Sequence, residues 1–412
     1  MRGRFKKIKL PQTYMGFPVH SNSRPDVKLG LRKKGIAMVT AIMIIAVLMM
    51  FVADILISSQ VNLQLNAANR DNVKAEYMAL SALNIGTMLL TADFAYDLMM
   101  MQQQPGAKEQ DGMGDFWSLL NEMPIGGETL EMLEMFRESF SLGKVLDSGI
   151  LEQLRQFDGT FVVNVFDESS KININMCARG RCIETKAMLE ALFSCPAERT
   201  FLDKKDLTPK QLVARIVDWV DSNNKPTEGA TYNEEDEIYE ERRPKTRTKN
   251  APFDSVDELR QIEGWDEDIH AAFSPYLTVF PYSKSNADKS TININTVNRS
   301  LMWCLFPEAR NDECAQKSTL SLKERNTDKT NLTDGKKVGE ILAESFCYSG
   351  GGDDSAKNRN SWFTQKSTVF RIEARGIVGD QEKVLRVVVE RTMPTDPKND
   401  MSTAKVLYWS FM

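Results

Sequence analysis

The chain has 412 residues, of which 42% are hydrophobic and 26% are charged, and its formal net charge is −5. These proportions are those of a folded protein with room for two or three domains, and they exclude a disordered chain. Only two histidines are present and no Cys-x-x-Cys occurs, which argues against a zinc site.

The N-terminal region combines a basic segment with a long apolar one. Residues 1–35 contain ten Lys or Arg and a single acid, Asp26, whereas residues 36–53 contain one polar residue, Thr40. The apolar trend resumes after Asp54, so about 22 residues are available to span a bilayer, which requires about 20. The basic flank predicts a cytoplasmic N-terminus, with the remainder of the chain outside. That remainder carries 42 basic and 56 acidic residues, which disfavours nucleic acid as a partner.

The helical pattern does not end with the apolar segment. Neither Pro nor Gly occurs between residues 36 and 85, and apolar residues recur at helical spacing through Leu63, Val73 and Leu80. We therefore predict one continuous helix from about residue 36 to about residue 90, half in the membrane and half outside it. This length is not typical of a cleaved signal peptide.

Strand and helix patterns alternate along the rest of the chain. Alternating apolar residues at 161–165 and 172–174, with a turn at 167–170, predict a hairpin. The sequence Ile-Asn-Ile-Asn occurs twice, at 172–175 and 292–295. Between the two copies, capping-box patterns at Thr208 and Ser255 predict helices. Residues 370–390 then predict a C-terminal hairpin with its turn at Gly379, and the last residues predict a final strand.

All six cysteines lie after the membrane segment, at positions 177, 182, 195, 304, 314 and 347. An even number outside the membrane allows three disulfides in 15 possible connectivities, and the alternative is that some of the cysteines remain free thiols. Cys177 with Cys182, and Cys304 with Cys314, are plausible local pairs because each pair is close in the sequence.

Two sets of motifs resemble a known family. Lys33-Lys34-Gly35 followed by Ile36-Ala37-Met38 is similar to the junction at which a prepilin leader is cut. Asp218-Trp219-Val220-Asp221 is then followed by Pro226, Gly229-Ala230, Glu235-Asp236, Tyr239, Asn250-Ala251-Pro252, Ser255, Glu258-Leu259 and Pro275-Tyr276. In order and spacing these motifs resemble the minor pseudopilin K family of bacterial type II secretion systems.

The resemblance implies an α+β, pilin-like fold in which a long N-terminal helix packs on an antiparallel sheet interrupted by an inserted helical subdomain. It divides the chain into a cytoplasmic leader (1–35), a transmembrane half of the helix (36–57), a periplasmic helix half with the first part of the pilin-like domain (58–175), an acidic helical insert (176–289) and a second, β-stranded part (290–412).

The family also implies how the chain is processed and what it assembles with. Prepilin peptidase would cut between Gly35 and Ile36 and leave the chain in the inner membrane, with its body in the periplasm. Ordinary pilins carry Glu at the fifth mature position, whereas this chain has Thr40, a departure known for the K subunit and suited to a subunit with nothing above it. The implied function is to cap the tip of the pseudopilus together with the I- and J-type minor pseudopilins, where secreted substrates would meet the tip.

Several oxygen-bearing side chains cluster in the insert. Asp218, Asp221, Asn223, Glu228, Glu234, Glu235 and Asp236 fall within 19 residues. Calcium takes six to eight oxygen ligands, which turning loops supply well. Because related K subunits bind calcium in this insert, the resemblance implies a structural calcium site that uses Asp221, Asn223, Glu235 and Asp236. A solvated acidic loop without a metal is the alternative.

Two other classes of function remain open at this point. Residues 255–277 resemble a helix-hairpin-helix module, which favours a membrane-tethered DNA-uptake protein. The usual Gly-x-Gly hairpin is replaced by Glu263-Gly264-Trp265-Asp266, whose acids oppose contact with phosphate. A tethered periplasmic enzyme is disfavoured, because no arrangement of a nucleophile and a base is found.

Overall fold

The computed structural model describes residues 31–103, 110–126, 131, 159–178, 182–196, 199–282, 290–333, 336–348, 350, 358–391 and 404–412. Residues 1–30, which hold most of the expected leader, lie outside this range. The chain divides into two compact units, residues 1–67 and residues 68–412.

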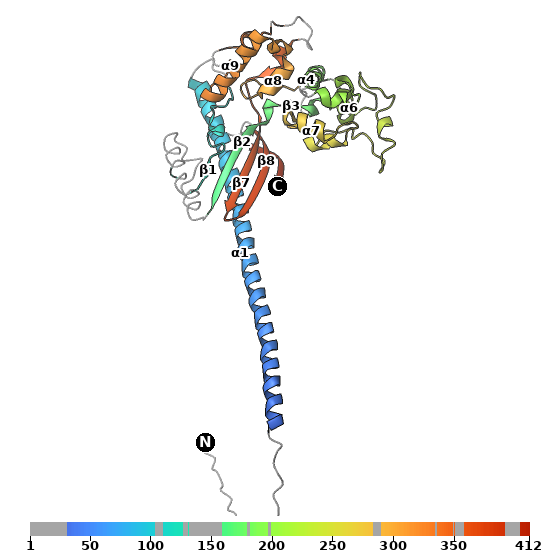
Figure 1. Ribbon diagram of the computed structural model, residues 1–412. Helices are drawn as coiled ribbons and strands as arrows, with labels where there is room; N and C mark the ends of the chain where they lie inside the picture. The colour runs from blue at the N-terminus through green and yellow to red at the C-terminus, as the bar shows by residue number, and fades with distance from the viewer. Residues whose placement is uncertain are drawn as a thin grey trace, which may run out of the picture. The chain divides into compact units, whose positions relative to one another are not determined.

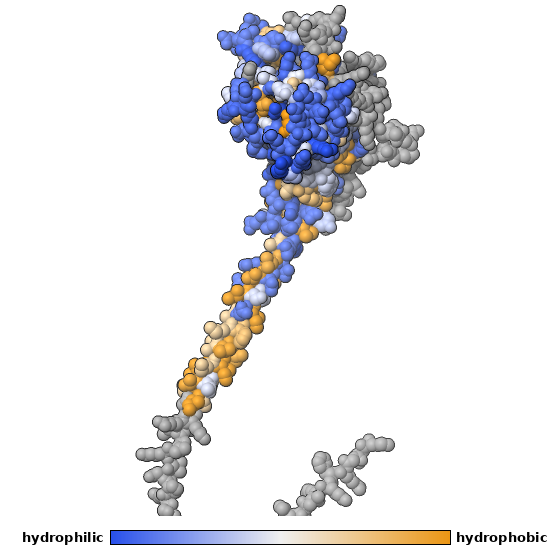
Figure 2. Space-filling model, turned by 90° about the vertical axis from the view of Figure 1, so that its right-hand side faces the viewer, coloured by the Kyte–Doolittle hydropathy of each residue, from blue (hydrophilic) through white to orange (hydrophobic). Residues whose placement is uncertain are grey.

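A single helix, α1 (Leu31–Gln103), forms most of the described N-terminal region. It is 73 residues long and ends beyond the predicted limit near residue 90. In the first unit, the large apolar side chains from Ile36 to Ile57 are exposed, and they give this segment a hydrophobic surface (Figure 2). Within the described residues, one helix is long and apolar enough to cross a membrane.

A five-stranded antiparallel sheet forms the framework of the second unit. Its strands are β1 (Pro124–Ile125), β2 (Thr160–Asp167), β7 (Val369–Val378), β8 (Gln381–Arg391) and β9 (Ala404–Phe411), and they lie in the order β1-β2-β7-β8-β9. The predicted C-terminal hairpin is β7–β8, with Gly379 at φ +56 in its turn. The α+β, pilin-like class is thereby established, with α1 lying along this sheet (Figure 1).

Small residues bring α1 against the sheet. Ala75, Ala79 and Ala82 are fully buried in one core with strand residues that include Val163 and Ile372. Gly376 of β7 lies so close to α1 that a Cβ atom there would be 2.0 Å from the carbonyl oxygen of Ala75. The buried alanines on this face of α1 and the glycine of β7 therefore set the distance between the helix and the strand.

The two Ile-Asn-Ile-Asn segments begin two similar helical parts. The first part contains β3 (Ile172–Asn173), η4 (Ile174–Cys177), α4 (Ile183–Phe193), α5 (Arg199–Asp203), α6 (Pro209–Val220), η5 (Glu237–Tyr239), η6 (Val256–Gln261), α7 (Glu267–Phe273), η7 (Ser274–Tyr276) and β4 (Leu277–Thr278). The second contains β5 (Ile292–Asn293), α8 (Arg299–Leu305), η8 (Pro307–Arg310), α9 (Asp312–Asp328), α10 (Val338–Phe346), η9 (Arg359–Trp362) and β6 (Phe363–Thr364). In each part the Ile-Asn strand pairs in parallel with the strand that closes it.

Each repeated motif serves the same purpose. Its two isoleucines are fully buried, and its first Asn caps the turn that follows. The Asn173 side chain accepts a bond from the amide of Asn175 at 2.9 Å, and Asn293 does the same for Asn295 at 2.9 Å. The second Asn then binds a distant backbone, at Phe253 and at Thr333 respectively.

Three expectations about these elements were wrong. The segments 161–165 and 172–174 do not form a hairpin, because β2 pairs with β1 and β7 while β3 pairs with β4. The region 290–412 is not purely β, since residues 299–346 contain three α-helices. The Ser255 side chain makes no capping bond and a 3₁₀ helix follows it, whereas the capping box of Thr208 and Gln211 is present.

Candidate functional site

The end of helix α6 positions two acids of the insert. Its apolar face, which includes Leu212 and Ile216, is buried, and this orients the helix in the core. Asp218 lies in the last turn and Asp221 is the C-cap residue, where the chain leaves helical geometry. Residues three apart lie on the same side of a helix, so the two carboxylates are neighbours.

Glu235 completes a cluster of three buried carboxylates. Carboxylate oxygens of Asp218, Asp221 and Glu235 all lie within 4.8 Å of one another. The three residues are 1%, 1% and 2% exposed. Acids at a helix C-terminus also face the negative end of its dipole, so the arrangement is unfavourable unless something compensates the charge.

The hydrogen bonds of the cluster leave one carboxylate unused. Asp218 accepts bonds from the amide of Thr227 at 2.8 Å and from the Tyr232 hydroxyl. Asp221 accepts one from the amide of Asn223 at 3.1 Å. Neither oxygen of the Glu235 carboxylate has a hydrogen-bond partner, although both are buried.

Burial and mutual repulsion disfavour ionisation of the cluster. Burial raises the pKa of Asp218 and Asp221. It also raises the pKa of Glu235 to about 8, with a further contribution from Asp218 and Asp221. Within the described part of the chain, no Lys or Arg lies within ion-pair distance of the three acids. An all-oxygen set of acids with two unpartnered oxygens has the chemistry that a calcium ion requires.

The chain is similar in sequence to proteins of bacterial secretion systems. Residues 170–282 match the family described as type II secretion system protein K. The type II secretion system protein K of Klebsiella pneumoniae is 25% identical over 285 residues, which cover 67% of this chain and 71% of that protein. The corresponding protein of Aeromonas hydrophila is 33% identical over 96 residues, covering 23% of this chain and 27% of that protein.

The fold agrees with these matches. The crystal structure of the GspK-GspI-GspJ complex from enterotoxigenic Escherichia coli contains a chain that superimposes with a TM-score of 0.54 at 14% identity. The match covers 84% of this chain and 99% of that one. Residues 170–282 therefore resemble the type II secretion system protein K family, and the fold of the chain agrees with that resemblance.

The acidic cluster differs from the ligand set expected from sequence. Asp221 and Glu235 are in it, but the Asn223 side chain instead accepts a bond from the amide of Lys225 at 2.8 Å. Asp236 accepts two bonds from Thr248, at 2.9 and 2.8 Å. Asp218, which the expected set omitted, lies in the cluster with Asp221 and Glu235. Its spacing of three residues from Asp221 on a helix is the sequence signal that could have indicated it.

The six cysteines of the chain form three disulfides. Cys177 is linked to Cys182, one of the two local pairs suggested by the sequence. The other suggested pair, Cys304 with Cys314, is wrong: Cys304 is linked to Cys195, and Cys314 to Cys347. Cys195 follows α4, which packs against α8, and Cys347 ends α10, which packs against α9, so helix packing and not sequence distance selects the partners.

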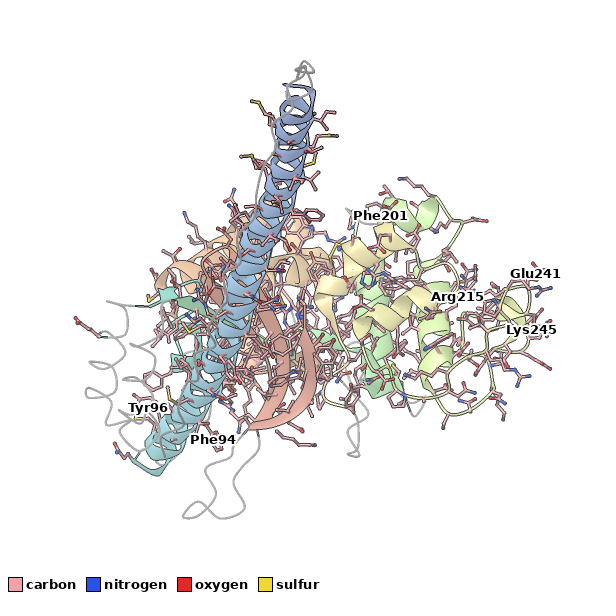
Figure 3. The ribbon with its side chains drawn as sticks, turned by 90° about the horizontal axis from the view of Figure 1, so that it is seen from below. Phe94, Tyr96, Phe201, Arg215, Glu241 and Lys245 are labelled. Atoms are coloured by element: carbon pink, nitrogen blue, oxygen red, sulfur yellow. A yellow bond between two sulfur atoms is a disulfide. The ribbon has the colours of Figure 1, made fainter. Side chains whose placement is uncertain are left out.

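The hairpin that resembles a DNA-binding module faces the protein's own helix. Gly264 has φ +87 between η6 and α7, and the preceding carbonyl of Glu263 accepts a bond from Arg215 of α6 at 2.7 Å. Arg215 lies inside the helical part, whereas Glu241 and Lys245 lie at its outer edge (Figure 3). The Glu263 carboxylate pairs with Arg242, and Asp266 caps α7. The turn is thus acidic and internally bonded, which argues against contact with a nucleic-acid backbone.

The expected processing site lies at the start of α1. Gly35 and Ile36 are within the helix, and the Ile36 side chain is 66% exposed. Thr40, at the fifth position after Gly35, donates its hydroxyl to the carbonyl of Ala37 at 3.0 Å. Cleavage between Gly35 and Ile36 stays a prediction.

Proposed function

We propose that this protein caps the tip of a periplasmic pseudopilus, in a complex with the I- and J-type minor pseudopilins, and thereby supports protein secretion. The observation that carries the proposal is Thr40. Because this residue is a threonine, α1 presents no carboxylate at the position where other pilins neutralise the terminal amine of the next subunit. The Thr40 hydroxyl instead donates to a carbonyl of its own helix. A subunit with none above it needs no such charge in the membrane.

The proposed topology follows from the charge and exposure of the N-terminal region. The ten basic residues before Ile36 stay in the cytoplasm. Residues 36–57 lie in the inner membrane, consistent with their apolar, exposed side chains. Prepilin peptidase removes the leader at Gly35, and the residues after 57 lie in the periplasm.

The partners bind along α1. Val61, Leu63, Leu65 and Val73 remain 47–68% exposed beyond the membrane segment, and exposed apolar residues on a helix favour packing against other helices. The similarity to a chain of the GspK-GspI-GspJ complex supports two other pseudopilins as occupants of this helix. Secreted substrates would meet the part of the body that these partners leave uncovered.

Two experiments test this function. N-terminal sequencing of the membrane-purified protein should find a mature start at Ile36, and an intact Met1 would contradict pilin-type processing. In pseudopili isolated from cells, a C-terminal tag on this chain should be labelled at one end only, whereas a tag on the major subunit labels the whole length. Label along the fibre would refute capping and leave the family resemblance intact.

We propose further that the acidic cluster holds a structural calcium ion. Asp218, Asp221 and Glu235 are the side chains that would bind it, and the two unpartnered oxygens of Glu235 are the main support. A divalent cation there would offset much of the charge of the three buried carboxylates, and its ligands would link the end of α6 to the loop that contains Glu235. Calorimetry on the purified chain in the presence of calcium should show binding, and an absence of heat and of any calcium-dependent stabilisation would remove the proposal.

A further inference from the structure

A second feature of interest is a cavity of about 550 Å³ within the 68–412 unit. It is surrounded by the end of β2, the turn after α7, the start of α8 and the end of α9. Its walls include segments far apart in the sequence: residues 113–122, 164–171, 275–276, 296–301 and 325–329. This volume is within the range of small-ligand sites.

Arg325, near the end of α9, is the unusual residue of this cavity. It is 4% exposed, and among the described residues its guanidinium donates to the Asn326 side chain at 3.1 Å and to the Ile294 carbonyl at 3.4 Å and to no other group. No described carboxylate lies within ion-pair distance of it, and burial alone lowers its pKa to about 10. Buried charges are normally paired. Arg391, which is also buried, follows that rule and pairs with Asp93 and Asp111.

The remaining charges around the cavity do not neutralise Arg325. Lys171 and Arg371 are already paired with Glu168, at 2.8 and 3.1 Å. Arg299 and Lys329 lie exposed at the rim, and no ion pair with a described carboxylate is formed by either.

The two acids of the cavity are also unsuited to compensate the guanidinium. Glu122 is exposed at the rim, and Asp167 is occupied by the hydroxyls of Ser367 and Thr296 and by the amide of Ser169. Five basic and two acidic side chains line the cavity, so its net charge is positive, in a protein whose residues after 35 carry an excess of acids.

Apolar side chains line the wall beside these cations. Trp117 is 2% exposed, and Val297 and Leu301 are fully buried. A ligand that fills this space must carry an apolar group next to its negative charge. The planar guanidinium binds a carboxylate through two parallel hydrogen bonds, and a single unpaired buried cation matches one negative charge.

We propose that this cavity binds a carboxylate attached to an apolar group, with Arg325 as its counter-ion. Two sources share that chemistry: the C-terminus of a polypeptide and an acidic side chain flanked by an apolar residue. The inference does not depend on capping of the pseudopilus or on calcium.

The test uses the full chain in lipid nanodiscs and ligand-observed NMR titration with short peptides. Acetyl-Phe-Leu carries a terminal carboxylate, and acetyl-Phe-Leu-amide is its neutral control. Acetyl-Phe-Glu-amide carries a side-chain carboxylate, and acetyl-Phe-Gln-amide is its control. At least one acid should bind about ten-fold more tightly than its amide, and the tighter acid identifies the source. Equal binding of both acids and their amides, or tighter binding of inorganic phosphate, would overturn the proposal.

Two variants locate the site. Arg325→Gln should weaken the preferred acid about ten-fold, whereas Arg375→Gln, which removes a half-exposed arginine of β7, should not change it. If Arg325→Gln does not fold, the double variant Arg299→Glu/Lys329→Glu at the exposed rim serves instead and should weaken the acid several-fold. Unchanged affinity in the variant that folds would place the binding elsewhere and refute the assignment.

Discussion

We expect Glu235 to make the stability of the protein depend on pH when no calcium is present. Burial and neighbouring acids raise its pKa from 4.5 to about 8 in the folded state. A carboxyl group whose pKa is higher in the folded state contributes to the free energy of unfolding. This contribution is complete below about pH 4.5 and is lost as the pH rises through about 8. In a calcium chelator, we therefore expect the urea midpoint to fall between pH 5 and pH 8.5, and saturating calcium should reduce this fall.

The variant Glu235→Gln isolates that contribution. Asp167, whose pKa burial raises to about 7, adds a fall of the same sign, so only the difference between parent and variant belongs to Glu235. The variant should lose most of the calcium stabilisation, which for the parent is about 2.7 kcal/mol at a calcium concentration 100-fold above Kd. Glu234→Gln, outside the cluster, is the matched control. If the parent and Glu235→Gln respond equally to calcium, the cluster is not the site.

Part of this site was predictable from the residues and part was not. The density of acids after α6 indicated the loop, and Asp221 and Glu235 of the expected set lie in the acidic cluster. The side chains of Asn223 and Asp236 have the same donor chemistry, but they bind the backbone of Lys225 and of Thr248. Such local bonds depend on the loop conformation and leave no signal in composition.

At the scale of elements, Gly376 sets how closely α1 packs on β7. A methyl group there would lie 2.0 Å from the Ala75 carbonyl oxygen and 2.6 Å from the Ala79 amide nitrogen, both backbone atoms. Neither can move without shifting the helix, so Gly376→Ala should lower the free energy of unfolding by about 3 kcal/mol. Denaturant titration followed by circular dichroism measures this loss.

Gly350→Ala is the control for that measurement. Its added methyl group would meet only the end of the Asn360 side chain, at 3.9 Å, and its effect should be within about 0.5 kcal/mol. A Gly376→Ala protein as stable as the control would mean that α1 and β7 are farther apart than described here.

Elements formed by contacts between residues close in the sequence were predictable, whereas elements formed by contacts between distant residues were not. The helix over 36–90 and the β7–β8 hairpin were predicted correctly, because local signals define both. The helix follows from the helical spacing of its apolar residues, and the hairpin follows from alternating apolar residues and the turn at Gly379. The hairpin at 161–174 was wrong, because β3 pairs with β4, about 100 residues later, over only two positions. The paired repeat of Ile-Asn-Ile-Asn was visible, but its parallel partners had no sequence signal of their own.

At the scale of the whole molecule, the disulfides differ in how much chain they close. Cys195–Cys304 spans 109 residues and joins the two helical parts, whereas Cys177–Cys182 spans five. Chain-entropy arguments assign about 4.7 kcal/mol to a loop of the first size and about 2 kcal/mol to one of the second. The double variant Cys195→Ser/Cys304→Ser should therefore lower the melting temperature more than Cys177→Ser/Cys182→Ser does. Equal losses would show that local strain or packing, and not loop closure, determines the effect.

The proposed membrane anchoring requires that the apolar side chains of residues 36–57 have no protein partner. Ile44 is 60% exposed near the middle of this segment, so it would contact lipid in the proposed topology. A lysine there costs about 2.5–3.5 kcal/mol of insertion free energy, and Ile44→Lys should increase the fraction of protein extracted from membranes by alkaline carbonate. Asn62→Lys, on the same helix but beyond the apolar segment, should leave extraction unchanged. If both variants stay in the membrane fraction, another part of the chain anchors the protein, and the assignment of residues 36–57 as its membrane segment fails.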